Sequence, residues 1–217
     1  CGQPGTYPAT GGKKGRVALL MGCVQSVLDP GINAATIRLL TRLGFEVVVS
    51  GEEACCGSLT HHMGKEEDAL ARARRSVDQW IKADVDHVIV TASGCGTTIK
   101  DYGHMLRLDP AYAEKAKAIS AKAKDVTEFL AGLDLPEAEG SLRLAYHSAC
   151  SMQHGQKLKT EPQKLLRRAG FKVMEVPEGH LCCGSAGTYN ILQPEIATKL
   201  RDRKVANIES TAPRAIA

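Results

Sequence analysis

The chain has 217 residues, of which 43% are hydrophobic and 24% charged, the balance of a folded globular protein rather than a disordered one. Its 28 basic and 24 acidic side chains leave a net charge of +4, too small an excess to indicate nucleic-acid binding, and aromatic residues that could stack on bases make up only 4%. The longest apolar run, near residues 17–24, is shorter than the roughly 18 residues of a membrane span, so we expect one or two globular domains.

The first residues admit two interpretations. Cys1 is either the lipidated first residue of a mature lipoprotein or, as we favour, part of a Gly-, Pro- and Lys-rich linker over residues 1–15 of a domain from a longer chain.

Strands and helices alternate after the linker. Short apolar or β-branched runs predict strands over 16–21, 46–50 and 87–91. Helical spacing of apolar residues predicts helices over 33–43 and 65–83, and one or two connecting helices over 109–133. This alternation is typical of a parallel sheet covered by helices on both faces.

The pattern begins again after residue 140, with strands over 142–147 and 172–176 and helices over 161–169 and 194–208. Three cysteines of this second half follow three of the first half by the same 127 residues: Cys23 and Cys150, Cys55 and Cys182, Cys56 and Cys183. We therefore predict an α/β fold of two pseudo-symmetric Rossmann-like half-domains, each a parallel sheet flanked by helices, over residues 16–138 and 139–217.

Cysteines mark the carboxyl ends of the predicted strands, where the loops of an open parallel sheet converge on ligands. Helix N-termini at the same edge supply amide donors and a positive potential that favours thiolates. Because a disulfide between neighbouring residues is strained, the two Cys-Cys-Gly sequences favour metal or redox chemistry over structural cross-links. The candidate ligands are Cys23, Cys55, Cys56, Cys95, Cys150, Cys182 and Cys183.

Other interpretations of these residues stay open. Four thiolates are also enough for a tetrahedral structural zinc site, although zinc modules usually contain Cys-x-x-Cys pairs and this chain has none. Two histidines flank Cys150, at His147 and His154, and are candidates to donate hydrogen bonds to a ligand held by the thiols.

Longer motifs around the cysteines carry a resemblance. The spacing Cys23-x31-Cys55-Cys56-Gly57-x37-Cys95, with the sequences over 70–74, 91–96 and 180–189, resembles the tandem cysteine-rich, or CCG, domain family. That family includes cysteine-rich components of heterodisulfide reductase and of anaerobic glycerol-3-phosphate dehydrogenase, and the iron–sulfur subunits of lactate and glycolate oxidation. The motifs are most similar to the C-terminal portion of glycolate oxidase iron–sulfur subunits.

The resemblance implies a cofactor and partners. The cofactor would be a [4Fe-4S] cluster, with Cys23, Cys55, Cys56 and Cys95 as the thiolates of the first repeat. The partners would be flavin-containing subunits of a glycolate oxidase complex and an N-terminal ferredoxin-like domain of the same full-length chain. The chain would relay electrons towards a membrane acceptor, from the cytoplasm or at the inner membrane through its complex, as an oxidoreductase subunit that is not itself catalytic.

Two rival functions remain within these expectations. One is a heterodisulfide-reductase-like thiol/disulfide redox subunit, although Ala92-Ser-Gly-Cys95 here departs from the Cys-x-x-Cys of that enzyme. The other is a zinc-binding module that only assembles other subunits. In a fragment made aerobically, the cluster is expected to be lost or replaced by zinc, because clusters on solvent-facing loops are exposed to oxidation. The second site is expected to bind metal worse than the first, because the second repeat stops before the position 222 that corresponds to Cys95.

Overall fold

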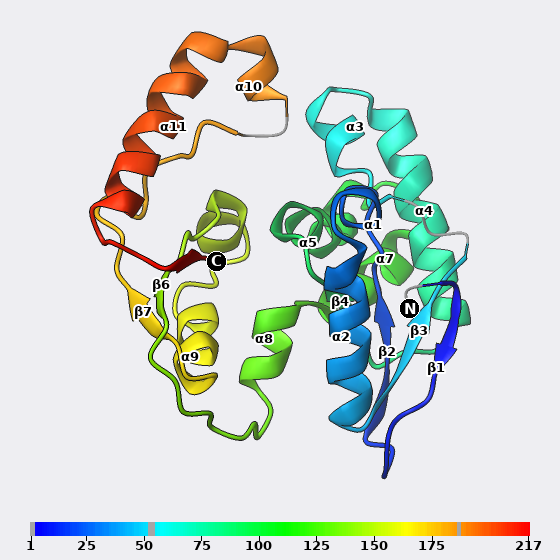
Figure 1. Ribbon diagram of the computed structural model, residues 1–217. Helices are drawn as coiled ribbons and strands as arrows, with labels where there is room; N and C mark the ends of the chain where they lie inside the picture. The colour runs from blue at the N-terminus through cyan, green and yellow to red at the C-terminus, as the bar shows by residue number, and fades with distance from the viewer. Residues whose placement is uncertain (1–2, 52–54, 186–187) are drawn as a thin grey trace. The chain divides into compact units, whose positions relative to one another are not determined.

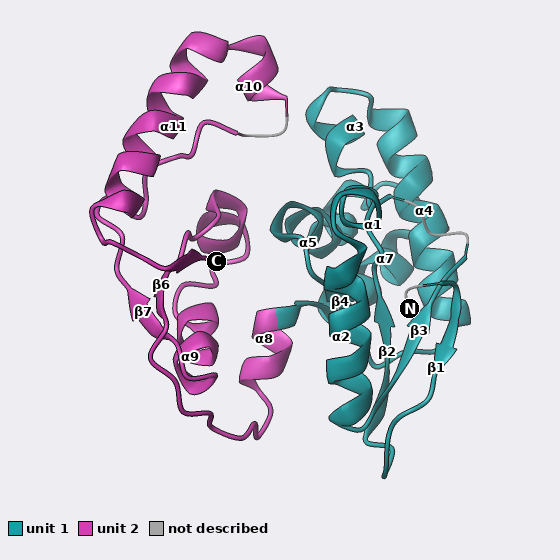
Figure 2. Cartoon of the chain, viewed as in Figure 1, with its two compact units in different colours: residues 1–126 teal, residues 127–217 magenta. Residues whose placement is uncertain are grey.

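The computed structural model describes residues 3–51, 55–185 and 188–217, and it divides into two compact units, 1–126 and 127–217 (Figure 1 and Figure 2). Cys1 lies outside the described residues, as do Ala186 and Gly187 of the sequence over 180–189. The division falls at Val126, ahead of the boundary expected at 138–139.

Unit 1 is built on a five-stranded sheet with the order β1-β3-β2-β4-β5. The strands are β1 (Gly5–Tyr7), β2 (Gly15–Leu19), β3 (Phe45–Val49), β4 (His87–Val90) and β5 (Ala123–Asp125). Strands β2 to β5 are parallel, with Val17 of β2 in register with Val47 of β3 and with His87 of β4. The expected linker contains β1, which pairs antiparallel with β3.

Helices connect these strands and cover the sheet (Figure 1). They are α1 (Gln25–Leu28), α2 (Pro30–Arg42), α3 (Ser58–His62), α4 (Glu66–Lys82), α5 (Ser93–Lys100), α6 (Tyr102–Met105) and α7 (Ala113–Lys122), and α8 (Val126–Ala131) follows β5 across the division between the units. The expected connecting helices over 109–133 are interrupted by β5. That three-residue strand is too short to show an alternating pattern, and its register comes from pairing with β4.

The core of unit 1 follows the two periodicities of its elements. Helix α4 buries Ala69, Ala73, Val77 and Trp80, the face expected from its helical spacing. On β2 and the residue after it, alternate side chains are buried on opposite faces of the sheet, and Leu20 joins the cluster around Trp80.

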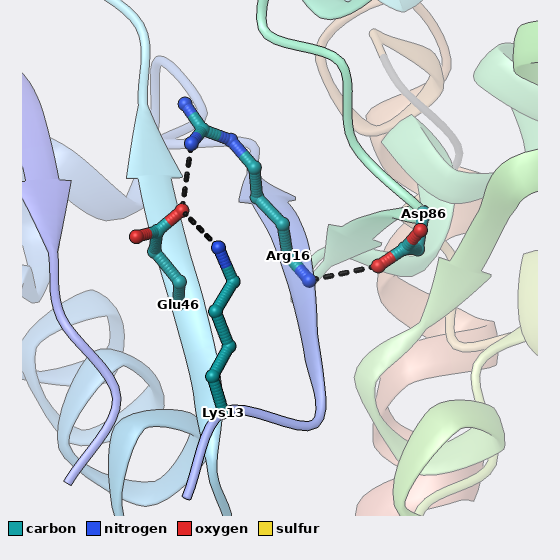
Figure 3. Close-up of polar contacts among 4 residues, drawn as sticks. All are labelled: Lys13, Arg16, Glu46 and Asp86. Atoms are coloured by element: carbon teal, nitrogen blue, oxygen red, sulfur yellow. Dashed lines mark hydrogen bonds and ion pairs between the residues drawn. The ribbon is translucent and has the colours of Figure 1, made fainter.

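Charged contacts fix the start of β2 (Figure 3). The carboxylate of Glu46 accepts hydrogen bonds from Lys13 Nζ at 3.1 Å and from an Arg16 guanidinium nitrogen at 2.7 Å. The backbone N–H of Arg16 donates to Asp86 Oδ2 at 2.8 Å. These contacts lower the pKa of Glu46, and the largest contribution comes from the hydrogen bond of the Lys13 ammonium. They therefore favour the ionised carboxylate, which joins β2 to β3.

Unit 2 repeats the central part of this sheet. Its strands β6 (Arg143–Ala145), β7 (Lys172–Met174) and β8 (Ala215–Ile216) are parallel, in the order β7-β6-β8. This is the order β3-β2-β4 of unit 1, so the expected Rossmann-like halves with parallel sheets are confirmed. The helical segments of unit 2 are the π-helix η1 (Ser151–Gly155), α9 (Glu161–Arg168), α10 (Tyr189–Leu192) and α11 (Pro194–Glu209). Within the described part of the chain, every helix is too short or too polar to cross a lipid bilayer.

Candidate metal centres

Each unit gathers cysteines at the carboxyl ends of its parallel strands. In unit 1 they follow β2, β3 and β4, and in unit 2 they follow β6 and β7, as the sequence predicted. We call Cys23, Cys55, Cys56 and Cys95 the first thiol group, and Cys150, Cys182 and Cys183 the second thiol group. All seven are free thiols.

The thiols of the first group are near enough to act on one another. Partial burial of the Cys23 thiol raises its pKa first, although the residue as a whole is exposed, and the neighbouring charge and hydrogen bond of Cys55 raise it further. The charge of Cys56 adds to this effect on the pKa of Cys23. Two loops that are far apart in sequence, after β2 and after β3, therefore meet at one edge of the sheet.

Cys56 and Cys95 form a hydrogen-bonded pair at the border of the core. The Cys56 thiol donates to the sulfur of Cys95, which raises the pKa of Cys56 and lowers that of Cys95. Burial acts in the same direction on Cys56, whose residue is only 2% exposed. Cys95 is thus the member of this pair most ready to become a thiolate, the form of cysteine that binds metal.

Glycine and tyrosine support the Cys55-Cys56 loop. Gly57 has a φ of 81°, and its backbone N–H points at Cys55 Sγ, 3.5 Å from its nitrogen. The hydroxyl of Tyr102, fully buried on α6, donates to the carbonyl of Cys56 at 2.7 Å. An N–H donor at the sulfur stabilises its negative charge, and the tyrosine anchors the loop to the core.

Two polar side chains not singled out in the sequence hold the other loops. Asn33 of α2 is fully buried and donates to the carbonyl of Met21 at 2.7 Å, ahead of Cys23. Gln25 donates to Thr91 Oγ1 at 2.9 Å and so joins the Cys23 loop to the segment that leads to Cys95. Both are polar residues that the fold buries. A single sequence does not distinguish a buried polar residue on a helix from one at the surface.

The second thiol group has the same local construction. Gly184 has a φ of 83°, and its N–H points at Cys182 Sγ with 3.4 Å between the nitrogen and the sulfur. Burial raises the pKa of Cys150 first, and the charge and hydrogen bond of Cys182 and the charge of Cys183 raise it further. The second half of the chain therefore also brings its predicted cysteines together.

The two candidate histidines differ in their surroundings. His147 is half-buried, and its pKa is lowered first by burial and then by the positive charge of Lys204. His154 is exposed on η1. The structure thus places His147 in the electrostatic environment of a buried lysine. Lys204 itself was missed in the sequence, where it falls in the charged run 201–204 of a helix.

The donor chemistry of both groups suits a thiophilic metal centre. Thiolates are soft ligands that favour iron–sulfur clusters, zinc or copper(I) over magnesium or calcium, and the first group supplies the four thiols of an ordinary four-iron cluster. Among the residues that the structure describes, no three His, Cys, Asp or Glu side chains already surround a single metal position. Six of the thiols lie instead in hydrogen-bonded pairs, Cys23 with Cys55, Cys56 with Cys95 and Cys150 with Cys182, so metal binding must displace their protons.

Comparisons with known proteins agree with this duplication. The family described as "CCG: Cysteine-rich domain" matches the chain over residues 17–100 and 144–217, one match for each thiol group. The chain is 45% identical to the glycolate oxidase iron-sulfur subunit of Escherichia coli K12 over 94% of its length and 51% of the relative's. It is 35% identical to the probable glycolate oxidase iron-sulfur subunit of Bacillus subtilis 168 over 96% of its length and 48% of the relative's.

A shorter relative is covered more completely. Lactate utilization protein A of Bacillus licheniformis is 31% identical over 91% of this chain and 84% of the relative. The chain therefore spans about half the length of the two glycolate oxidase relatives but most of this one. With both of its halves matched, the chain belongs to the cysteine-rich CCG domain family.

Proposed function

We propose that the chain is an iron–sulfur electron-transfer component of a 2-hydroxy-acid oxidising complex, with glycolate as the substrate of its partner subunits. The observation that carries the proposal is the convergence of four thiols at one edge of the unit 1 sheet, repeated with three thiols in unit 2. The names of relatives at 45% and 35% identity support iron–sulfur chemistry and glycolate.

The chain's own residues would hold the cofactor. Deprotonated Cys23, Cys55, Cys56 and Cys95 would bind a [4Fe-4S] cluster in unit 1, and Cys150, Cys182 and Cys183 would contribute to a second site. When bound, such a cluster supplies a one-electron carrier. The amides of Gly57 and Gly184 would keep donating to sulfur and so stabilise the negative charge of a reduced site.

The proposed reaction balances across the complex. Flavin-containing subunits would take two electrons and two protons from glycolate to give glyoxylate. This chain would then carry the electrons, one at a time, from those subunits and a ferredoxin-like domain towards a membrane acceptor, in the cytoplasm or at the inner membrane through the complex. No group of the chain is assigned to the substrate chemistry.

The test is anaerobic reconstitution of the full-length protein with iron and sulfide, followed by iron and sulfide analysis. The replacements Cys55→Ser and Cys56→Ser should each remove the first site's iron, because a hydroxyl is a far weaker ligand for iron than a thiolate. Cys1→Ser is the matched control, since Cys1 has no counterpart in the repeat. Full iron and sulfide in both variants would show that these residues are not ligands.

Metal analysis of the reconstituted protein and one activity assay separate the rival functions. Zinc without iron after anaerobic reconstitution would replace the proposal with a zinc-binding assembly module. Turnover of a low-molecular-weight disulfide by the intact protein would replace it with a thiol/disulfide redox subunit.

A further inference from the structure

A buried lysine lies next to the loop that carries Cys182 and Cys183. Lys204 of α11 is only 3% exposed, and its Nζ donates to the carbonyl oxygens of Glu178 at 3.1 Å and Gly179 at 3.2 Å. Lysine is almost never buried unless it has partners for its charge, so these two carbonyls account for its position. They stand only a few residues ahead of Cys182.

Two further side chains of α11 bind the backbone corner at Glu178 through its carboxylate. Its carboxylate accepts hydrogen bonds from the Arg203 guanidinium and, at 2.9 Å, from Asn207 Nδ2. Glu178 has a φ of +50°, in the left-handed region that non-glycine residues seldom adopt. Helix α11 therefore holds a backbone turn that would be unfavourable on its own.

The same corner reaches the segment that follows Cys150. Gln153 of η1 donates to the carbonyl of Gly179 at 3.4 Å, the oxygen that also accepts from Lys204. The carbonyl of Gly179 thus joins the segment after Cys150 to the segment before Cys182.

The first unit has no such charge at the corresponding position. Gly57 lies against Ala69 of α4, and Gly184 lies against Ala197 of α11, so close that an added Cβ would contact each alanine. Because these two alanines occupy equivalent places, α4 and α11 align at an offset of 128 residues. At that offset Lys204 corresponds to Ser76, which is also buried, at 2% exposure. The two thiol groups therefore share a scaffold, and at this helix position only the second group has a buried cation.

We propose that Lys204 is a positioning residue of the second thiol group: it fixes the Glu178–Gly179 corner and places, beside the segment that leads to Cys182, a buried positive charge absent at Ser76. This inference rests on the proposed function for its redox consequence. A nearby cation favours the more negative, reduced form of a bound redox centre, so Lys204 should raise the reduction potential of whatever the second site holds.

The test compares Lys204→Met with Lys204→Arg in the full-length protein, in a Cys55→Ser background that removes iron from the first site. Lys199→Met, on an exposed position of the same helix, is the matched control. The variants are compared at the solution potential at which the second site of the control is half reduced. At that potential, Lys204→Met should lower the ratio of reduced to oxidised second sites about tenfold, which corresponds to a reduction potential about 59 mV lower for a one-electron couple. Lys204→Arg should keep most of the control's ratio, because it retains the charge.

A second measurement needs no cofactor. In the apo protein, the pKa of His147 followed by NMR should rise in Lys204→Met and stay unchanged in Lys199→Met, because the charge that disfavours imidazolium is gone. Hydrogen exchange of residues 178–183 should become faster in the same variant. If Lys204→Met does not fold, Lys204→Gln, which keeps N–H donors but not the charge, takes its place.

The outcomes separate the two proposals. Equal potentials, His147 pKa values and exchange rates in Lys204→Met and Lys199→Met would overturn the role of Lys204. A Lys204→Arg variant as impaired as Lys204→Met in potential and His147 pKa would overturn the charge effect. If no variant, the control included, binds iron, the proposed function fails, whereas the His147 and exchange measurements still decide the role of Lys204.

Discussion

Alanine at the two Cys-Cys-Gly glycines should damage the two units unequally. Gly57 and Gly184 have nearly the same φ, 81° and 83°, so either alanine would bear about 1–2 kcal/mol for the left-handed conformation. Their surroundings differ. A Cβ on Gly57 would lie 3.1 Å from the carbonyl oxygen of Ala69, a tight contact that a small shift relieves. A Cβ on Gly184 would lie well under 3.0 Å from the carbonyl oxygen of Ala197, which is helix backbone.

The second contact forces the loop away from α11. Overpacking of this kind costs about 1–3 kcal/mol, which gives about 2–5 kcal/mol for Gly184→Ala against about 1–2 kcal/mol for Gly57→Ala. Hydrogen–deuterium exchange of peptides that contain each loop measures the difference. The loss of protection in Gly184→Ala should exceed that in Gly57→Ala by roughly 5- to 140-fold, from about 1–3 kcal/mol at 1.4 kcal/mol per factor of ten. Equal losses, or a larger loss in Gly57→Ala, would refute the reasoning.

Two further perturbations test the contacts that hold the loops. Tyr102→Phe leaves the buried carbonyl of Cys56 without its 2.7 Å donor and should lower the free energy of unfolding by about 1–3 kcal/mol. Urea titrations followed by circular dichroism measure this change. An unchanged unfolding midpoint would show that the hydrogen bond does not stabilise the fold. The hydrogen bonds of Arg203, and then of Asn207, lower the pKa of Glu178 to about 2. The ionised carboxylate therefore stabilises the fold at pH values above its usual pKa of 4.5, and this contribution is lost as the pH falls from 4.5 to about 2. Glu178→Gln should flatten that part of the curve of melting temperature against pH, and a curve parallel to that of the unaltered protein would contradict the assignment.

Most of the fold could be predicted because its elements carry strong periodic signals. The helical spacing over 65–83 predicted α4 to within a residue at each end, and the β-branched run over 46–50 predicted β3. The short elements carried no such signal. Strand β1 lies among Gly and Pro residues typical of a linker, and its conformation comes from pairing with β3 rather than from local preference.

The candidate site divides in a similar way. The equal spacing of cysteines in the two halves predicted which thiols would meet, because a duplicated sheet brings the same strand ends together. The supporting contacts were not predictable from spacing. Lys204 stands among Arg201, Asp202 and Arg203, and nothing in that run distinguishes the one side chain that points inward to the carbonyls of Glu178 and Gly179.

The stacking of two aromatic rings beneath the first thiol group gives the chain an intrinsic optical probe. Trp80 is the chain's one tryptophan, its ring is stacked on that of Tyr102 with 6.4 Å between centroids, and the Tyr102 hydroxyl holds the carbonyl of Cys56. Indole emission from this chain therefore originates in unit 1, where only the Tyr102 side chain lies between the indole and the Cys55-Cys56 loop. A coloured centre bound there would quench that emission by energy transfer, so loading of unit 1 could be followed by fluorescence without any added label.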